Sequence, residues 1–185
     1  MALDPLILKV ISIGLGLMFL FAAYHKLSDT ANFRVTLLEY QVMPDLLVSP
    51  ASRIIPLLEL FLGGCWLLSV YLQGLIATGS AVLLGLYALA IGVNIYRGRV
   101  HFDCGCGFAG KNEKEQYLSG GLIFRNGILM IAALIALVPS SGRELGVGDY
   151  LTLFAALLAG VLLFGAANQL LANRAAINTW RNLRD

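Results

Sequence analysis

Five long apolar stretches constrain the fold of this chain more than any other feature of its sequence. They cover about residues 5–24, 54–72, 75–96, 121–138 and 150–171. Each reaches or approaches the roughly 20 residues that a helix needs to cross a bilayer. The stretches are continuous rather than alternating, and in lipid only helices or closed barrels satisfy the backbone polar groups. The sequence therefore predicts an all-α fold, a polytopic membrane helix bundle that forms a single integral membrane domain over residues 1–185.

The composition agrees with a protein embedded in the lipid bilayer. Hydrophobic residues make up 58% of the chain and charged residues 13%, whereas a soluble domain carries about 25% charged residues. The net charge of +2 is too small to indicate a nucleic-acid partner. The first apolar stretch has no basic region before it and is long enough to span, so we expect a retained helix rather than a signal peptide. Residues 31–43 mix apolar and polar side chains, which predicts a short amphipathic helix at the membrane interface that Pro44 ends.

Basic residues outside the apolar stretches lie almost entirely on one side of the predicted membrane. Arg143 is the one basic residue on the side of the N-terminus, whereas ten lie on the other side, in residues 25–53, residues 97–120 and the C-terminal tail. The positive-inside rule then predicts a multi-pass protein of the cytoplasmic (inner) membrane, with its N-terminus outside and its C-terminus in the cytoplasm. Residues 97–120 would face the cytoplasm.

Several polar residues lie within or at the ends of the predicted helices, all towards the basic side. Glu59 and Arg125 fall inside helices, where an unpaired charge costs several kcal/mol, so we expect them to pair with each other. With Asn94 and Asn126 at about the same depth, they would line a pocket able to hold a cofactor. For Lys26, Asn94 and Asn168 the favoured alternative is that the end of a helix simply tolerates a polar residue without a special role.

Residues 101–108 read HFDCGCGF and contain two of the three cysteines. Three cysteines are too few for a disulfide scaffold, and two so close together point to chemistry. A disulfide between Cys104 and Cys106 needs a tightly bent backbone, which the glycine between them permits. Such a small ring is strained, and strained bridges exchange readily. Basic neighbours would raise the thiolate fraction, and His101 or Asp103 could assist proton transfer.

Two other interpretations of this motif remain open. His101, Asp103, Cys104 and Cys106 could bind zinc or copper, although structural zinc sites usually use two spaced pairs of ligands and no second pair follows here. The thiols could also be inert, in a non-catalytic assembly factor that needs only its helices. Cys65, near the middle of the second apolar stretch, is more typical of a small hydrophobic residue in a core.

Four sequence elements follow one another along the chain. They are a Gly-rich first helix ending in His25-Lys26-Leu27, the segment Phe33…Tyr40…Pro44, the run Pro56-Leu57-Leu58-Glu59-Leu60 with Gly63, and Asp103-Cys104-Gly105-Cys106. In this order they resemble the MauE branch of the MauE/DoxX family of redox-associated membrane proteins, over most of residues 10–138. The family continues the cysteine pair with Phe-Gly, whereas this chain has Gly107-Phe108.

The resemblance implies a four-helix core, to which this chain would add a fifth C-terminal transmembrane helix. It implies a membrane thiol–disulfide oxidoreductase or electron conduit, linked to maturation of the disulfide-rich methylamine dehydrogenase, with Cys104 and Cys106 as its redox pair. A thioredoxin-like protein partner is implied as well, and a quinone cofactor by analogy with quinone-coupled disulfide-forming enzymes. Maturation of an exported enzyme favours cysteines outside the membrane. The charge pattern favours the cytoplasm, and we adopt it because it belongs to this chain.

Overall fold

The described part of the chain is built from helices. The computed structural model describes residues 2–68, 73–99 and 120–182, with side chains as far as residue 170. Its helices are α1 (Pro5–Ser28), α2 (Thr30–Tyr40), α3 (Asp45–Leu67), α4 (Gln73–Tyr96), α5 (Gly120–Ile135) and α6 (Val147–Asn182). Four of them are long and apolar enough to cross a membrane, namely α1, α3, α4 and the part of α6 from Val147 to Leu170. The predicted fold class, a polytopic helical membrane protein, is confirmed.

Several helices differ in length from the apolar stretches that predict them, and α6 extends to Asn182 although its stretch was expected to end at about residue 171. α3 begins at Asp45, nine residues before the predicted start at residue 54, and it contains Pro50 and Pro56. Prolines and polar residues made residues 45–53 resemble a connection, but membrane helices tolerate proline because neighbouring groups satisfy the freed carbonyls. α5 has 16 residues and is shorter than the other apolar helices.

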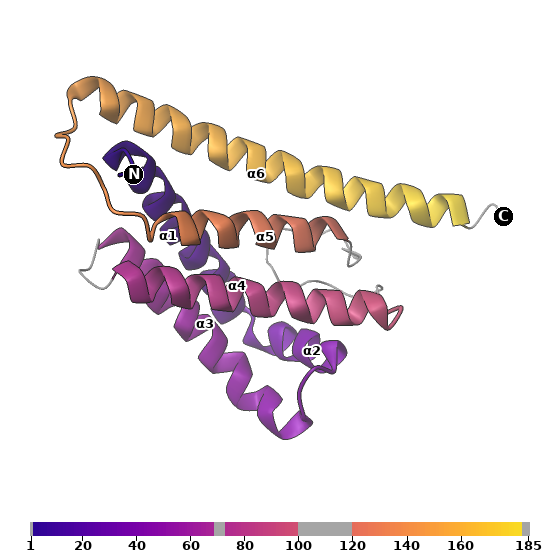
Figure 1. Ribbon diagram of the computed structural model, residues 1–185. Helices are drawn as coiled ribbons and strands as arrows, with labels where there is room; N and C mark the ends of the chain where they lie inside the picture. Colours follow the sequence, from indigo (N-terminus) through magenta and orange to yellow (C-terminus); the bar gives the residue numbers. More distant parts are fainter. Residues whose placement is uncertain (1, 69–72, 100–119, 183–185) are drawn as a thin grey trace.

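Asp29 joins α1 directly to α2. Its backbone N–H donates to the carbonyl of His25 at the end of α1, and its side chain accepts from the N–H of Asn32 in the first turn of α2 at 3.0 Å. α2 ends at Gln41, whose backbone is left-handed with φ 45°. The buried Phe33 of α2 packs in one apolar cluster with Val48 of α3. α2 therefore covers the N-terminal half of α3 (Figure 1).

The closest helix crossing lies between α1 and α3. A Cβ atom added to Gly63 would lie 3.0 Å from the carbonyl oxygen of Gly16 and 3.0 Å from the backbone nitrogen of Leu20. A Cβ atom on Gly16 would in turn lie 3.2 Å from the carbonyl oxygen of Gly63. Small residues allow this approach, as is common between membrane helices. The other extensive contact joins α4 and α5, which run side by side (Figure 1).

Trp66 of α3 lies at the centre of the main apolar core. It is 2% exposed and packs with Phe19 of α1 and Leu84 of α4. Its indole N–H donates to the hydroxyl of Ser80 at 2.9 Å, and its carbonyl accepts from the hydroxyl of Ser12 at 2.6 Å. Because buried polar groups cost free energy unless they are hydrogen-bonded, these two serines make the tryptophan compatible with the core of the bundle.

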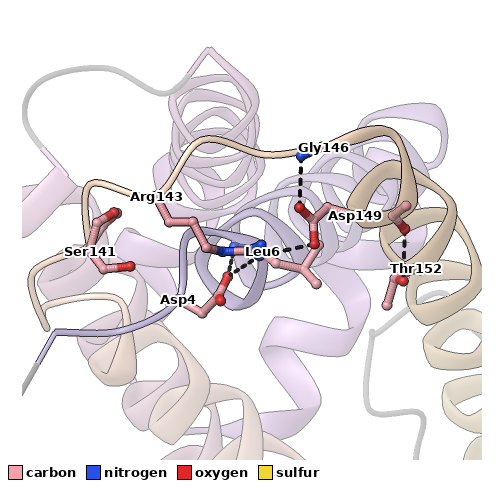
Figure 2. Close-up of polar contacts among 9 residues, drawn as sticks. Asp4, Leu6, Ser141, Arg143, Gly146, Asp149 and Thr152 are labelled. Atoms are coloured by element: carbon pink, nitrogen blue, oxygen red, sulfur yellow. Dashed lines mark hydrogen bonds and ion pairs between the residues drawn. The ribbon is translucent and has the colours of Figure 1, made fainter.

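The segment between α5 and α6 closes the N-terminal end of the bundle. The N–H of Ser141 donates to the carbonyl of Leu3 at 2.7 Å. Arg143 then forms ion pairs with Asp4 at 3.2 Å and with Asp149 at 3.0 Å, as Figure 2 shows. Arg143 is the basic residue that the sequence places alone on this side, and both of its partners are acidic residues of the same end.

Asp4 is also the N-cap residue of α1. Its carboxylate accepts from the backbone N–H of Leu6 at 2.8 Å, which satisfies one free donor of the first turn. This hydrogen bond and the guanidinium of Arg143 hold the pKa of Asp4 below its ordinary value. The hydrogen bond of Arg143 with Asp149, and to a smaller extent the one with Asp4, raises the pKa of Arg143. The start of α1 is therefore fixed to the start of α6 by charge as well as by the backbone.

Candidate functional site

A buried polar cluster joins α1, α3 and α4 near the end of the bundle opposite Asp4. Lys26 comes from the last turn of α1, Glu59 from α3 and Tyr87 from α4, and the side chains of Lys26 and Glu59 are 6% and 1% exposed. The Lys26 ammonium donates to Oε1 of Glu59, with which it forms an ion pair, and to the Tyr87 hydroxyl at 3.3 Å. The Tyr87 hydroxyl donates to the same Oε1 at 2.7 Å. Three helices thus meet at one carboxylate oxygen.

The two carboxylate oxygens of Glu59 differ in their hydrogen bonding. Oε1 of Glu59 accepts two hydrogen bonds, whereas Oε2, although buried, has no hydrogen-bond partner among the described residues. The ammonium of Lys26 lies 4.8 Å from the centre of the Tyr87 ring and 5.3 Å from the centre of the Phe33 ring. Aromatic faces stabilise a cation in a site that excludes water, and the C-terminal turn of a helix favours one. The ammonium of Lys26 is therefore stabilised by an ion pair, a hydrogen bond and two aromatic rings together.

Helical periodicity explains how these side chains come together. The buried face of α1 recurs every three or four residues and ends in Lys26: Leu8, Ser12, Leu15, Phe19, Ala22, Ala23 and Lys26. The buried face of α3 does the same around Glu59: Val48, Ser52, Pro56, Glu59, Leu62, Gly63 and Trp66. The expectation that Lys26 is merely a polar residue tolerated at the end of a helix is wrong, because the lysine, although it lies in the last turn of α1, is buried and paired with Glu59. In the sequence, the spacing that places Lys26 on the same face of α1 as Phe19 and Ala22 indicated that the lysine is buried.

A cavity of about 510 Å³ lies beside the cluster. Its described lining residues are mostly apolar and come from the end of α1, from α2 and the segment after it, from α3 and from α4. Lys26 and Tyr87 line one part of it, and Arg97, just beyond the end of α4, lines another. Leu86 and Leu89 line it as well and are 54% and 63% exposed, so the cavity opens at the surface of α4. The volume and lining are those of a small-molecule site.

The predicted ion pair between Glu59 and Arg125 does not form. Glu59 pairs with Lys26, and Nη1 of Arg125 donates to the side-chain oxygen of Asn168 on α6 at 2.8 Å. Arg125 also lies 5.6 Å from the centre of the Phe164 ring. The reason is packing: α3 packs mainly on α1 and α5 mainly on α4, so the two charges face different neighbours. Residues at one depth in a membrane need not lie on facing sides of their helices.

The two asparagines of the predicted pocket are buried. Asn94 is 0% exposed and Asn126 is 4% exposed. Each side-chain amide donates to the carbonyl four residues earlier in its own helix, Ala90 at 2.9 Å and Leu122 at 3.1 Å. Neither residue belongs to the lining of the cavity described above, nor do Glu59 and Arg125. Glu59 is hydrogen-bonded to Lys26, which does line the cavity. Cofactor binding by these four residues stays a prediction.

The predicted redox motif lies outside the described residues. His101, Asp103, Cys104 and Cys106 fall in the connection between the end of α4 and the start of α5, residues 97–119. Among the described side chains, in residues 2–68, 73–99 and 120–170, no group of three or more His, Cys, Asp or Glu could hold a metal ion. Cys65, which is described, is a free, partly buried thiol packed against the main apolar core.

The fold and the buried cluster define a polytopic helical membrane protein with a polar centre inside its bundle. Residues 4–139 match the family described as methylamine utilisation protein MauE. The chain belongs to this family. That match extends from the start of α1 to the end of α5, and so contains the Lys26–Glu59–Tyr87 cluster and the Cys-Gly-Cys motif.

Curated relatives carry the same description. The chain is 38% identical to the methylamine utilization protein MauE of Methylophilus methylotrophus over 105 residues, 56% of this chain and 54% of that protein. It is 32% identical to that of Paracoccus denitrificans over 148 residues, 77% of each chain. It is 32% identical to that of Paracoccus versutus over 163 residues, 87% of this chain and 83% of the relative. No solved structure matches the chain.

Proposed function

We propose that this chain is an accessory protein of methylamine utilisation that acts as a membrane thiol–disulfide oxidoreductase or electron conduit, with Cys104 and Cys106 as its redox pair. The name of the family supports the pathway. One observation carries the chemistry: a Cys-Gly-Cys motif stands in the connection between two helices, α4 and α5, that pack side by side. α4, after which the motif follows, also carries Tyr87, which contacts Lys26 and Glu59 and lies nine residues before the end of this helix at Tyr96; α4 and α5 run side by side (Figure 1).

The proposed chemistry balances as two half-reactions. Oxidation of the Cys104 and Cys106 thiols forms one S–S bond and releases two electrons and two protons. Exchange with a thioredoxin-like partner returns the pair to the dithiol, while two thiols of the partner become a disulfide. His101 or Asp103 would take up and return the protons at the cysteine sulfurs, because the thiolate is the form that attacks. A quinone, when bound, supplies an acceptor for two electrons and two protons, and the apolar cavity beside Lys26 has space for its ring.

We propose the cytoplasmic membrane as the location, with the N-terminus outside and the cysteine pair on the cytoplasmic side. The support is the excess of basic residues at that end. The N-terminal end has Arg143 as its basic residue, and there the charge is neutralised by two carboxylates. A cytoplasmic thiol donor would then supply the electrons.

Thiol trapping tests the redox pair. Acid-quenched membranes are alkylated with a mass-tagging maleimide before and after reduction. We expect the wild type to shift by two tags on reduction, and Cys104→Ser and Cys106→Ser to shift by none. Cys65→Ser is the matched control and should behave as the wild type, because this thiol packs in the core.

Three results would contradict the proposal. The first is a wild type whose cysteines are always reduced. The second is full growth on methylamine with Cys104→Ser/Cys106→Ser, which points to an assembly factor that needs only its helices. The third is stoichiometric zinc or copper that Cys104→Ser abolishes, which points to metal handling. Sidedness is measured separately with a membrane-impermeant maleimide, and we expect labelling of Cys104 and Cys106 in inverted vesicles but not in intact cells.

A further inference from the structure

We infer that the cavity beside Lys26 binds the head of a neutral, lipid-soluble carbonyl compound with a flat conjugated ring. The inference concerns a ligand site built by α1, α2, α3 and α4, distinct from the cysteine motif. It rests on the proposed function and deepens it by specifying which side chains recognise the head of the quinone-class acceptor, yet the binding itself needs neither cysteine. The two ideas can therefore fail separately.

The shape of the cavity indicates a lipid-soluble ligand. Its volume of about 510 Å³ and its leucine, isoleucine and valine walls match an apolar molecule. The exposed Leu86 and Leu89 place the opening on the side of α4. α4 is one of the helices able to cross a membrane, so this opening faces lipid rather than water. A ligand carried in the bilayer can enter there without crossing an aqueous phase.

Hydrogen-bond donors define the head of the ligand. A lysine ammonium has three donors, and in the described part of the chain Lys26 directs two of them to Glu59 and Tyr87. The third is available to an acceptor in the cavity that Lys26 lines. Because an apolar site makes an unmet donor costly, an oxygen acceptor at this point would stabilise both the ligand and the lysine.

Charge selects a neutral oxygen over a carboxylate or phosphate. The ammonium of Lys26 is already neutralised by Glu59, so the deep part of the cavity has no net charge. The remaining lining cation is Arg97, ten residues beyond Tyr87 on the same helix axis and so about 15 Å away from the cluster. An anionic headgroup at Arg97 would leave its apolar tail against the buried ion pair. A carbonyl at Lys26 instead leaves the apolar part of the ligand along the leucine walls.

Aromatic side chains favour a flat ring over an aliphatic ketone. The rings of Phe33, Tyr40 and Tyr87 all line the cavity. Two of them, Phe33 and Tyr87, lie within 5.3 Å of the Lys26 ammonium, measured to their centres. A conjugated head can stack on such faces while its oxygen meets the ammonium. The site therefore has the donor, the ring faces and the apolar exit that a quinone ring with a short isoprenoid tail requires.

Binding is tested on the purified full chain in detergent by calorimetric titration with a ubiquinone analogue of one isoprene unit. Leu86→Trp enlarges a side chain that lines the cavity but takes no part in the hydrogen bonds of the buried cluster, and we expect at least tenfold weaker binding. Leu75→Trp, on the same helix at a position that is 69% exposed and does not line the cavity, is the matched control and should bind as the wild type. Tyr87→Phe should weaken binding about fivefold by disturbing the lysine, as expected for one lost hydrogen bond.

Further titrations distinguish a quinone site from the redox pair, from a lipid crevice and from a site for an anion. Cys104→Ser/Cys106→Ser should bind the analogue as the wild type does, which separates this site from the redox pair. Equal affinity of wild type and Leu86→Trp would overturn the inference. So would equal binding of a hydrocarbon of the same size without carbonyls, which indicates a mere lipid crevice. Dodecanoate that binds more tightly than the quinone analogue would overturn the choice of a neutral head.

Discussion

Replacing one partner of the buried Lys26–Glu59 pair should destabilise the bundle more than replacing both. Glu59→Leu leaves an ammonium whose side chain is 6% exposed without its counter-ion, and Lys26→Met leaves a carboxylate that is 1% exposed. Removal of one partner of a buried pair usually costs about 3–5 kcal/mol, because the other charge stays buried. Replacement of both by apolar residues of similar volume is often close to neutral.

The Tyr87 hydroxyl is the third member of the cluster and limits how much stability the double replacement can recover, because it donates to Glu59 at 2.7 Å. Lys26→Met/Glu59→Leu still leaves the Tyr87 hydroxyl without its acceptor, so about 1–3 kcal/mol should remain, and adding Tyr87→Phe should recover most of it.

The assay is the free energy of unfolding in mixed micelles, from titration with sodium dodecyl sulfate followed by circular dichroism. The double-mutant cycle should give a coupling energy of about 2 kcal/mol or more, with the two singles each worse than the double. Single variants that lose less than about 0.5 kcal/mol, the scale of an exposed ion pair, would refute the reasoning. Such a result means that water reaches the pair and that the site is not buried.

Two further predictions concern the packing and the N-terminal end. Gly63→Ala should cost about 1–3 kcal/mol of unfolding free energy in the same titration, because the new methyl group meets backbone atoms of α1 at 3.0 Å. Gly64→Ala, which meets nothing within 4 Å, should cost nothing, and equal losses in both would contradict the close crossing. Asp4→Asn should lower the melting temperature at pH 7, and its difference from the wild type should begin to shrink as the pH falls below about 4. The sign follows from the lowered pKa of Asp4: its contribution is present above the ordinary pKa and is lost as the pH falls through the lower value in the fold. A difference that stays constant from pH 7 down through that lower value would mean that Arg143 does not act through this charge.

The sequence predicts the existence of these helices well because apolar length is a property of each stretch by itself. It predicts their ends less well. α3 contains the prolines Pro50 and Pro56, so residues that break helices in water are poor signals of the ends of helices in a bundle. α1 continues past the charged Lys26 to Ser28, so a charged residue does not mark the end of a helix either. The all-α class depends on length and composition alone, whereas boundaries depend on what each end packs against.

Partners within the bundle depend on helix rotation, which a single sequence constrains only through its buried face. Glu59 and Arg125 have compatible charges and similar depth, and still face different neighbours. Lys26 shares the periodicity of Phe19 on α1, and that periodicity, taken with the buried face of α3, favours a pair with Glu59. The face of its helix on which a residue lies is therefore more informative about its contacts than its depth in the membrane.

The two ends of the bundle differ in how their charges are held, and this difference bears on where chemistry can occur. At the N-terminal end the charges of Asp4, Arg143 and Asp149 are exposed or partly exposed and satisfy one another. At the other end Lys26 and Glu59 are buried, and a carboxylate oxygen lacks a partner in the described part of the chain. A buried pair contributes little net stability compared with apolar residues, so stability alone does not account for its presence. Its position beside the cavity that Lys26 and Tyr87 line is the observation on which the inferred binding of a ligand oxygen rests.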